Sequence, residues 1–169
     1  PQDKFLENEE VQQILQILGC GVFEQYNSKK LKYGKVLIAV DADADGLSIS
    51  NLLITFFYVC LPKFIEEGRL HWMKAPLYYN DKKHQYIFTE EEWSKVRNKK
   101  DFTRAKGLGQ YSVAAVKEAL FGDSKRWEQL YVKDWKKFSD KVELLMGDSV
   151  DGRRELLFDR VDFEKIKFM

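Results

Sequence analysis

The sequence has little cysteine. Its two cysteines, Cys20 and Cys60, are far apart and form no C-x-x-C pair, which excludes the usual thiolate zinc site and the usual dithiol redox motif. Both lie in apolar surroundings of apparently helical pattern. We expect both thiols to pack in a core, as free cysteines of a protein in a reducing compartment do.

Long apolar runs and a large net charge are also missing. The longest apolar run, Leu52 to Leu61, is about half of what a membrane span needs, and no signal peptide or lipidation motif is visible. These features predict a cytoplasmic protein without a membrane partner. The formal charge is only +1, from 28 basic and 27 acidic residues, so contact with nucleic acid would depend on local patches.

The composition is that of a folded protein. With 169 residues, 44% hydrophobic and 14% aromatic, the chain is long enough to bury one substantial core or two small ones. It begins with Pro1 rather than methionine, which suggests processing or a fragment of a longer protein. There are no internal repeats and no low-complexity tracts.

The first half has the pattern of an α/β protein. Apolar residues at helical spacing predict helices over 8–18 and from Ser48 to about Pro62. Between them, the β-branched run of residues 36–40 predicts a parallel strand buried on both faces, and residues 69–79 predict a second strand. Strand, helix and strand at this spacing predict a right-handed parallel unit.

The second half is mainly helical in pattern. A short strand is expected over 85–88, followed by a helix that Thr89 caps at its N-terminus. Further helices are expected over 112–120, 134–146 and 150–158. The two histidines, His71 and His84, have no metal-like spacing, and the tryptophans are expected to pack in cores or subunit interfaces rather than to stack on bases.

The most informative segment is Asp41-Ala-Asp-Ala-Asp-Gly46, directly after the first predicted strand. Open α/β sheets bind ligands at the carboxyl ends of their strands. In an extended chain alternate side chains point the same way, so Asp41, Asp43 and Asp45 can converge. Three such carboxylates repel one another unless they share a cation, and oxygen ligands favour Mg²⁺ or Mn²⁺.

Three alternatives to a magnesium loop have different requirements. An EF-hand calcium loop needs a preceding helix and a glutamate at its twelfth position; here a predicted strand precedes the loop and that position is Leu52, so calcium is rejected. A solvated acidic turn that caps the next helix is the simplest alternative. A D-x-D phosphatase of the haloacid-dehalogenase type also places its motif after a parallel strand, and Asp41 would then be the nucleophile.

Further informative blocks occur along nearly the whole chain. In chain order, with the acidic loop included, they are Leu18–Gly21, Tyr26–Asn27, Leu31–Tyr33, Asp41–Gly46, Leu52–Tyr58, Ala75–Tyr78, Lys106–Gly109, Leu145–Ser149 and Arg153–Arg154. Together these blocks resemble the large subunit of type IIA DNA topoisomerases, the family of gyrase B and topoisomerase IV B. The resemblance implies an α/β fold, namely an incomplete TOPRIM region over about residues 1–80, followed by a mainly helical tail over 81–169.

The resemblance also implies roles for individual residues. Asp41, Asp43 and Asp45 match the family's Mg²⁺ ligands, with Asp41 and Asp43 as catalytic residues that assist a tyrosine of the partner subunit in attacking a DNA phosphodiester. A second set matches a block expected to contact DNA phosphates: Arg104, Lys106, Gly107 and Gly109. ATP would bind a part of the enzyme that is absent from this chain.

Departures from the family pattern qualify these expectations. The glutamate of the family's E-G-D-S-A motif and the basic stretch after it do not occur in this sequence, nor does the ATPase part. Leu47 and Ser48 replace the usual serine and histidine, and Ala105 replaces a tyrosine. Similar drift, with a split large subunit, occurs in large bacterial viruses. The resemblance therefore predicts a subunit that is inactive alone and works in a bacterial cell or an infected host, or an inactive interaction remnant.

Overall fold

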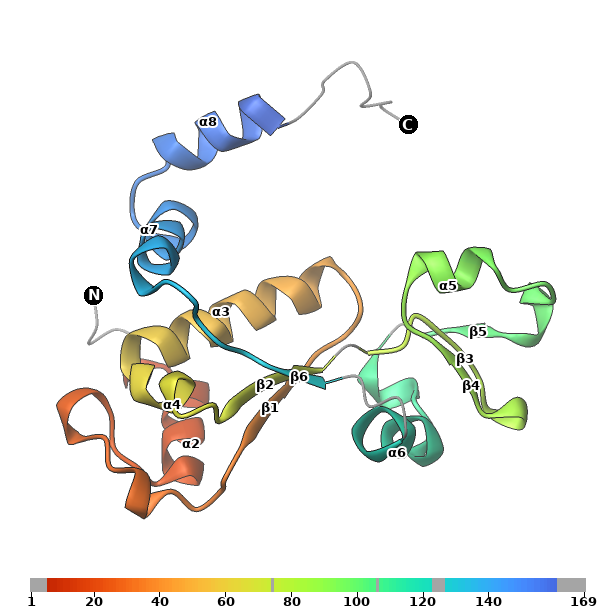
Figure 1. Ribbon diagram of the computed structural model, residues 1–169, viewed down its shortest axis with the longest axis horizontal. Coiled ribbons are helices and arrows are strands. Elements are labelled where there is room, and N and C mark those ends of the chain that lie inside the picture. The colour runs from red at the N-terminus through yellow and green to blue at the C-terminus, as the bar shows by residue number, and fades with distance from the viewer. Residues whose placement is uncertain (1–5, 74, 106, 123–126, 161–169) are drawn as a thin grey trace. The chain divides into compact units, whose positions relative to one another are not determined.

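The computed structural model describes residues 6–73, 75–105, 107–122 and 127–160. The chain divides into two compact units, residues 1–131 and 132–169 (Figure 1). The α-helices of the first unit are α2 (Glu9–Leu18), α3 (Ala44–Cys60), α4 (Pro62–Glu66), α5 (Glu90–Ser94) and α6 (Val113–Phe121). Its strands are β1 (Val36–Ala39), β2 (Leu70–Met73), β3 (Tyr78–Asn80), β4 (Gln85–Ile87), β5 (Thr103–Arg104) and β6 (Trp127–Gln129).

The first sheet has the order β1, β2, β6. β1 and β2 are parallel, with Val36 opposite Leu70 and Ala39 opposite Met73, and α3 and α4 form the connection between them (Figure 1). The predicted strand, helix and strand unit is therefore confirmed. β6 runs antiparallel to β2 and was not predicted, because three residues with two polar side chains carry no clear strand pattern.

β1 differs from the prediction of a strand buried on both faces. It ends at Ala39 instead of Val40, and within the described sheet its one neighbour is β2. Ile38 is buried, but Ala39 is exposed. An uninterrupted apolar run indicates a strand that is suited to burial on both faces. Whether both faces are buried depends on the neighbouring elements, which the run itself does not determine.

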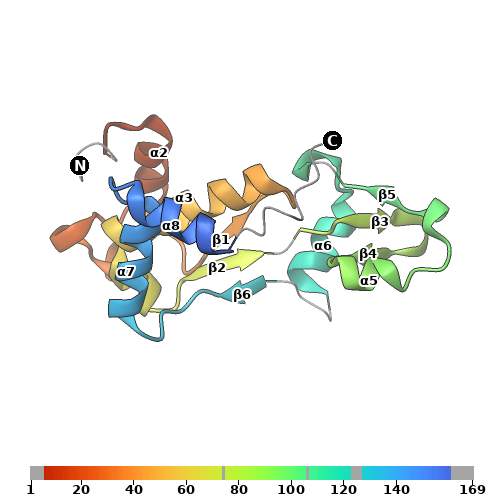
Figure 2. The same ribbon diagram turned by 90° about the horizontal axis from the view of Figure 1, so that it is seen from above.

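The single strand predicted over residues 69–79 is wrong, because the structure has two strands there in different sheets. β2 ends at Met73 and β3 begins at Tyr78, with Pro76, which has no N–H to give to a sheet, between them. β3 lies between β4 and β5 in an antiparallel second sheet. Tyr78 of this sheet stacks on Trp93 of α5 with ring centroids 3.7 Å apart. Figure 2 shows α5 beside the strands β3, β4 and β5.

Helix starts follow side-chain caps. Asn8, Thr89 and Ser112 each accept a hydrogen bond from the N–H three residues ahead, which confirms the predicted cap at Thr89. Gly19, with φ +68°, ends α2 in the left-handed conformation that favours glycine. α3 begins four residues before the predicted Ser48, because Asp43 accepts the N–H of Gly46 at 2.8 Å.

The core lies under α3 and α4. Its fully buried side chains are Phe56, Phe57, Phe64, Leu61, Leu70, Cys20 and Cys60. Both cysteines therefore pack in the core, as predicted, and burial raises the pKa of the Cys60 thiol to about 11. His71 is also buried, edge-on against Trp127, whereas His84 is exposed in a turn.

Short 3₁₀ turns connect the elements of the first unit. They are η1 (Phe23–Gln25), η2 (Ser28–Lys30), η3 (Asp81–Lys83), η4 (Lys99–Asp101) and η5 (Leu108–Gln110). The second unit contains α7 (Trp135–Met146) and α8 (Asp151–Arg160), close to the helices predicted there. Arg153 of α8 donates to the carbonyl of Gly147 at 2.7 Å, which fixes the turn between them. None of the described helices is long and apolar enough to cross a bilayer.

Candidate functional site at the acidic loop

The acidic loop leaves the carboxyl end of β1 and enters α3. Asp41 lies just past the strand and is partly buried, while Asp43 occupies the N-cap of α3 and is exposed. Asp45 lies in the first helical turn, also exposed. The extended conformation assumed from the sequence therefore ends at Asp43, and Asp45 lies on the helix instead of continuing the alternation.

Gly46 allows the tight turn from strand to helix. A Cβ atom at this position would lie 2.1 Å from the carbonyl oxygen of Asp41, a distance that only a moved backbone could relieve. Glycine is therefore required at this position by the close approach of the backbone and not by a positive φ.

The loop around Gly107 contacts the acidic loop. The backbone N–H of Leu108 donates to Oδ1 of Asp41 at 2.6 Å, and a Cβ at Gly107 would lie 3.7 Å from Oδ2 of the same carboxylate. Two of the segments predicted from the sequence therefore meet. Gly109 is exposed in η5, and Lys106 lies outside the described residues.

Arg104 lies close to the acidic loop as well. A pocket of about 250 Å³ is lined by Asp43 and Arg104 together with Ala42, Leu77, Tyr78, Glu90 and Ala105. The sequence did not single out Glu90, because an acidic residue in the first turn of a helix is explained by the helix dipole alone. The pocket joins carboxylates and a guanidinium, groups that suit a metal-bound phosphate.

Tyr111 is an uncharged neighbour of Asp41. Its hydroxyl donates to the carbonyl of Pro76 at 2.7 Å. Burial, and then the charge of Asp41 and the neighbouring Tyr79, raise the pKa of Tyr111 to about 12. The phenol therefore stays protonated at neutral pH and places no second negative charge beside the aspartate.

The carboxylate oxygens of the acidic loop are suitable ligands for a divalent cation that prefers oxygen. One oxygen of Asp41 is held by Leu108 and one of Asp43 by Gly46; in the described part of the chain, the second oxygen of each has no hydrogen bond or ion pair. No group of three or more metal-ligating side chains is assembled among the described residues. Mg²⁺ commonly takes one or two carboxylates and completes its shell with water and substrate phosphates, so two aspartates are compatible with it.

Fold and loop together define a mixed α/β protein with an acidic loop at the carboxyl end of a parallel strand. No family model matches the chain. Among curated proteins, the chain is 33% identical to the DNA topoisomerase 4 B subunit of Rickettsia felis, over 97% of this chain and 27% of that protein. It is 31% identical to the DNA gyrase B subunit of Staphylococcus epidermidis, over 98% of this chain and 27% of that protein.

A third relative, the DNA gyrase B subunit of Treponema denticola, is 33% identical over 92% of this chain and 26% of its own length. The chain is therefore homologous to a segment of the type IIA DNA topoisomerase large subunit, as the resemblance of its sequence blocks predicts. It spans about a quarter of the length of these curated relatives.

Proposed function

We propose that the chain supplies the metal-binding part of an ATP-dependent type IIA DNA topoisomerase. In this proposal residues 1–80 are a TOPRIM-like region without its first strand and residues 81–169 are a mainly helical tail. The observation that carries it is the meeting of Asp41 and Asp43 with Arg104 and the Gly107 loop, because two segments that are far apart in the sequence converge where a phosphate could bind.

Each residue has a distinct task. Asp41 and Asp43 hold the cation through their second oxygens, and Asp45 on the first turn of α3 adds negative charge beside them. Arg104 binds the phosphate whose bond is broken, and the same sequence block supplies Lys106, Gly107 and Gly109 as further phosphate contacts. A bound Mg²⁺, or Mn²⁺ in its place, neutralises charge on the attacking and leaving oxygens of a phosphoryl transfer.

The remaining chemistry comes from other parts of the enzyme. The nucleophile is a tyrosine of the DNA-cleaving partner subunit, double-stranded DNA is the substrate, and ATP binds an N-terminal ATPase part that this chain lacks. The enzyme acts in the cytoplasm of a bacterial cell or of an infected host. We expect the chain alone to be inactive.

The test is plasmid cleavage and relaxation with Mg²⁺ and ATP by this chain mixed with the other subunits. Asp43→Asn is the informative variant, because an asparagine side chain still caps α3 while the charge is lost. Asp134→Asn makes the same change at the N-cap of α7 and is the matched control. We expect cleavage to disappear in the first variant and to persist in the second; equal activity of both would refute the proposal.

The D-x-D phosphatase alternative gives a different result in the same preparations. The isolated chain would then hydrolyse small phosphomonoesters through Asp41, without partner subunits or DNA. The relatives named above are topoisomerase subunits, so the comparisons give this alternative no support.

A further inference from the structure

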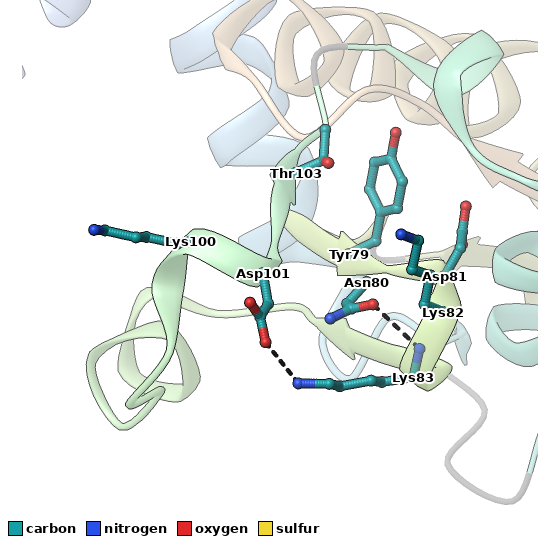
Figure 3. A pocket seen from close by; sticks show the side chains of 8 residues that line it. All are labelled: Tyr79, Asn80, Asp81, Lys82, Lys83, Lys100, Asp101 and Thr103. Atoms are coloured by element: carbon teal, nitrogen blue, oxygen red, sulfur yellow. Dashed lines mark hydrogen bonds and ion pairs between the residues drawn. The ribbon is translucent and has the colours of Figure 1, made fainter.

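Two short turns with paired lysines lie next to each other at the second sheet. η3 has the sequence Asp81-Lys82-Lys83 and follows β3, and η4 has the sequence Lys99-Lys100-Asp101 and precedes β5. Both turns contribute to one pocket of about 540 Å³ (Figure 3). Its lining consists of Tyr79, Asn80, Asp81, Lys82, Lys83, Lys100, Asp101 and Thr103.

Specific bonds hold the two turns in place. Lys83 forms an ion pair with Asp101 at 2.6 Å and so joins η3 to η4. Asn80, which is buried, accepts the backbone N–H of Lys83 at 3.1 Å and fixes the shape of η3. Asp81 accepts the hydroxyl of Ser112 at 2.7 Å. Both carboxylates of the pocket are thereby engaged by neighbouring groups.

The lysines are not all engaged in the same way. Lys83 is paired with Asp101, and the ammonium of Lys99 lies over the ring of Trp93, 5.1 Å from its centroid. Lys82 and Lys100 are exposed, and the described part of the chain offers neither of them an ion-pair partner. Figure 3 shows both side chains directed away from the ion pair between Lys83 and Asp101.

We propose that this pocket is a second DNA-binding site, at which Lys82 and Lys100 contact the phosphodiester backbone of the duplex. The hydroxyl groups of Tyr79 and Thr103 also line the pocket, and side chains of these types are common phosphate ligands in protein–DNA contacts. Lys82 and Lys100 are exposed and carry their positive charges on long side chains, which suits a continuous polyanion better than a small enclosed ligand.

The pocket is connected to the acidic loop through β3 and β5. In their register Arg104 is opposite Tyr78 and Thr103 is opposite Tyr79, so adjacent positions line the two pockets. Lys82 follows Tyr78 by four residues, which is at most about 14 Å of extended chain. That length corresponds to about four base pairs along a duplex. This inference therefore rests on the proposed function, and it extends the DNA contact beyond the cleavage site.

Binding of a fluorescently labelled 30-base-pair duplex by the full chain, followed by anisotropy over a range of salt concentrations, tests the proposal. We expect the double variant Lys82→Gln/Lys100→Gln to bind several-fold more weakly and to lower the slope of log K against log salt by about 2. Lys29→Gln/Lys30→Gln removes the same charges from another exposed 3₁₀ turn and should leave the slope unchanged.

Further arms separate this inference from the proposed function. Asp101→Asn removes the ion-pair partner of Lys83 and should tighten duplex binding. Inorganic phosphate, at the same total phosphate concentration as the duplex, should compete only weakly with the duplex for the chain. Asp43→Asn should abolish cleavage in the assembled enzyme but leave the effect of the two lysines on the salt slope intact. No binding of the duplex by the full chain, or equal slopes for the two double variants, would overturn the second site even if cleavage depends on Asp43.

Discussion

Asp41 and Leu108 are 67 positions apart in the sequence, yet the backbone N–H of Leu108 lies 2.6 Å from Oδ1 of Asp41. The bond connects the turn after β1 to the 3₁₀ turn that precedes α6. A carboxylate that accepts an N–H in this way is both oriented and partly neutralised. The relationship explains how one side chain can position the Gly107 loop and still present its other oxygen to a ligand.

The first prediction concerns this bond. Asp41→Ala should release the loop, and amide exchange at Leu108 should become roughly tenfold to a hundredfold faster, since a hydrogen bond to a charged group contributes about 1.5–3 kcal/mol. Hydrogen exchange read by mass spectrometry or NMR measures the change. Asp45→Ala, on the same loop but exposed, should leave Leu108 protected. Equal exchange in the two variants would show that the bond does not hold the loop.

The second prediction compares two glycines. Gly46→Ala should destabilise the protein by about 2 kcal/mol or more, because the new Cβ would lie 2.1 Å from the Asp41 carbonyl oxygen. Gly109→Ala meets nothing within 4 Å and should change the free energy of unfolding by less than about 0.5 kcal/mol. Urea unfolding measures the free energy of unfolding of both variants. Similar losses of stability in the two would contradict the tight turn at Gly46.

The third prediction concerns pH. The pKa of Tyr111 is raised to about 12 in the folded protein and is near 10 in an unfolded chain. The unfolded state therefore loses this proton first, so the free energy of unfolding should fall as pH rises from about 10 to 12, by up to about 1.4 kcal/mol per pH unit.

Tyr111→Phe removes that titration. Its unfolding free energy should fall less steeply over the same pH window than that of the unmodified protein, even though the variant loses about 1 kcal/mol at pH 7 with the hydrogen bond to Pro76. Tyr33→Phe, at an exposed position, checks at pH 7 that loss of a hydroxyl alone costs little. A Tyr111→Phe curve parallel to the unmodified one would refute the assignment.

The fourth prediction tests the core under α3. Phe57 is 1% exposed and Phe121 is 83% exposed. Phe57→Ala should lower the free energy of unfolding by about 3–5 kcal/mol, as deletion of a buried aromatic ring does. The same substitution at Phe121 should cost less than about 1 kcal/mol. Thermal or urea unfolding measures both, and comparable costs would mean that α3 is not packed as described.

Local patterns predicted much of the fold. Spacing and side-chain chemistry predicted the cap at Thr89 and the helices of both units. The order strand, helix and strand predicted the parallel pairing of β1 with β2. β6 and β5 were not foreseen because they are two or three residues long and depend on a partner strand that lies far away in the sequence. The division of residues 69–79 between two sheets also depends on those partners.

For the candidate site, the sequence alone determined which chemistry was available. The acidic loop was identified from three aspartates and a glycine that follow an apolar run. The blocks around it identified the family that the chain resembles. Only the tertiary structure decided the neighbours: Leu108 on Asp41, Arg104 and Glu90 beside Asp43, and two lysine turns joined by an ion pair. The physical reason is that each residue type carries its own chemical groups, whereas proximity between distant segments follows from how the whole core packs.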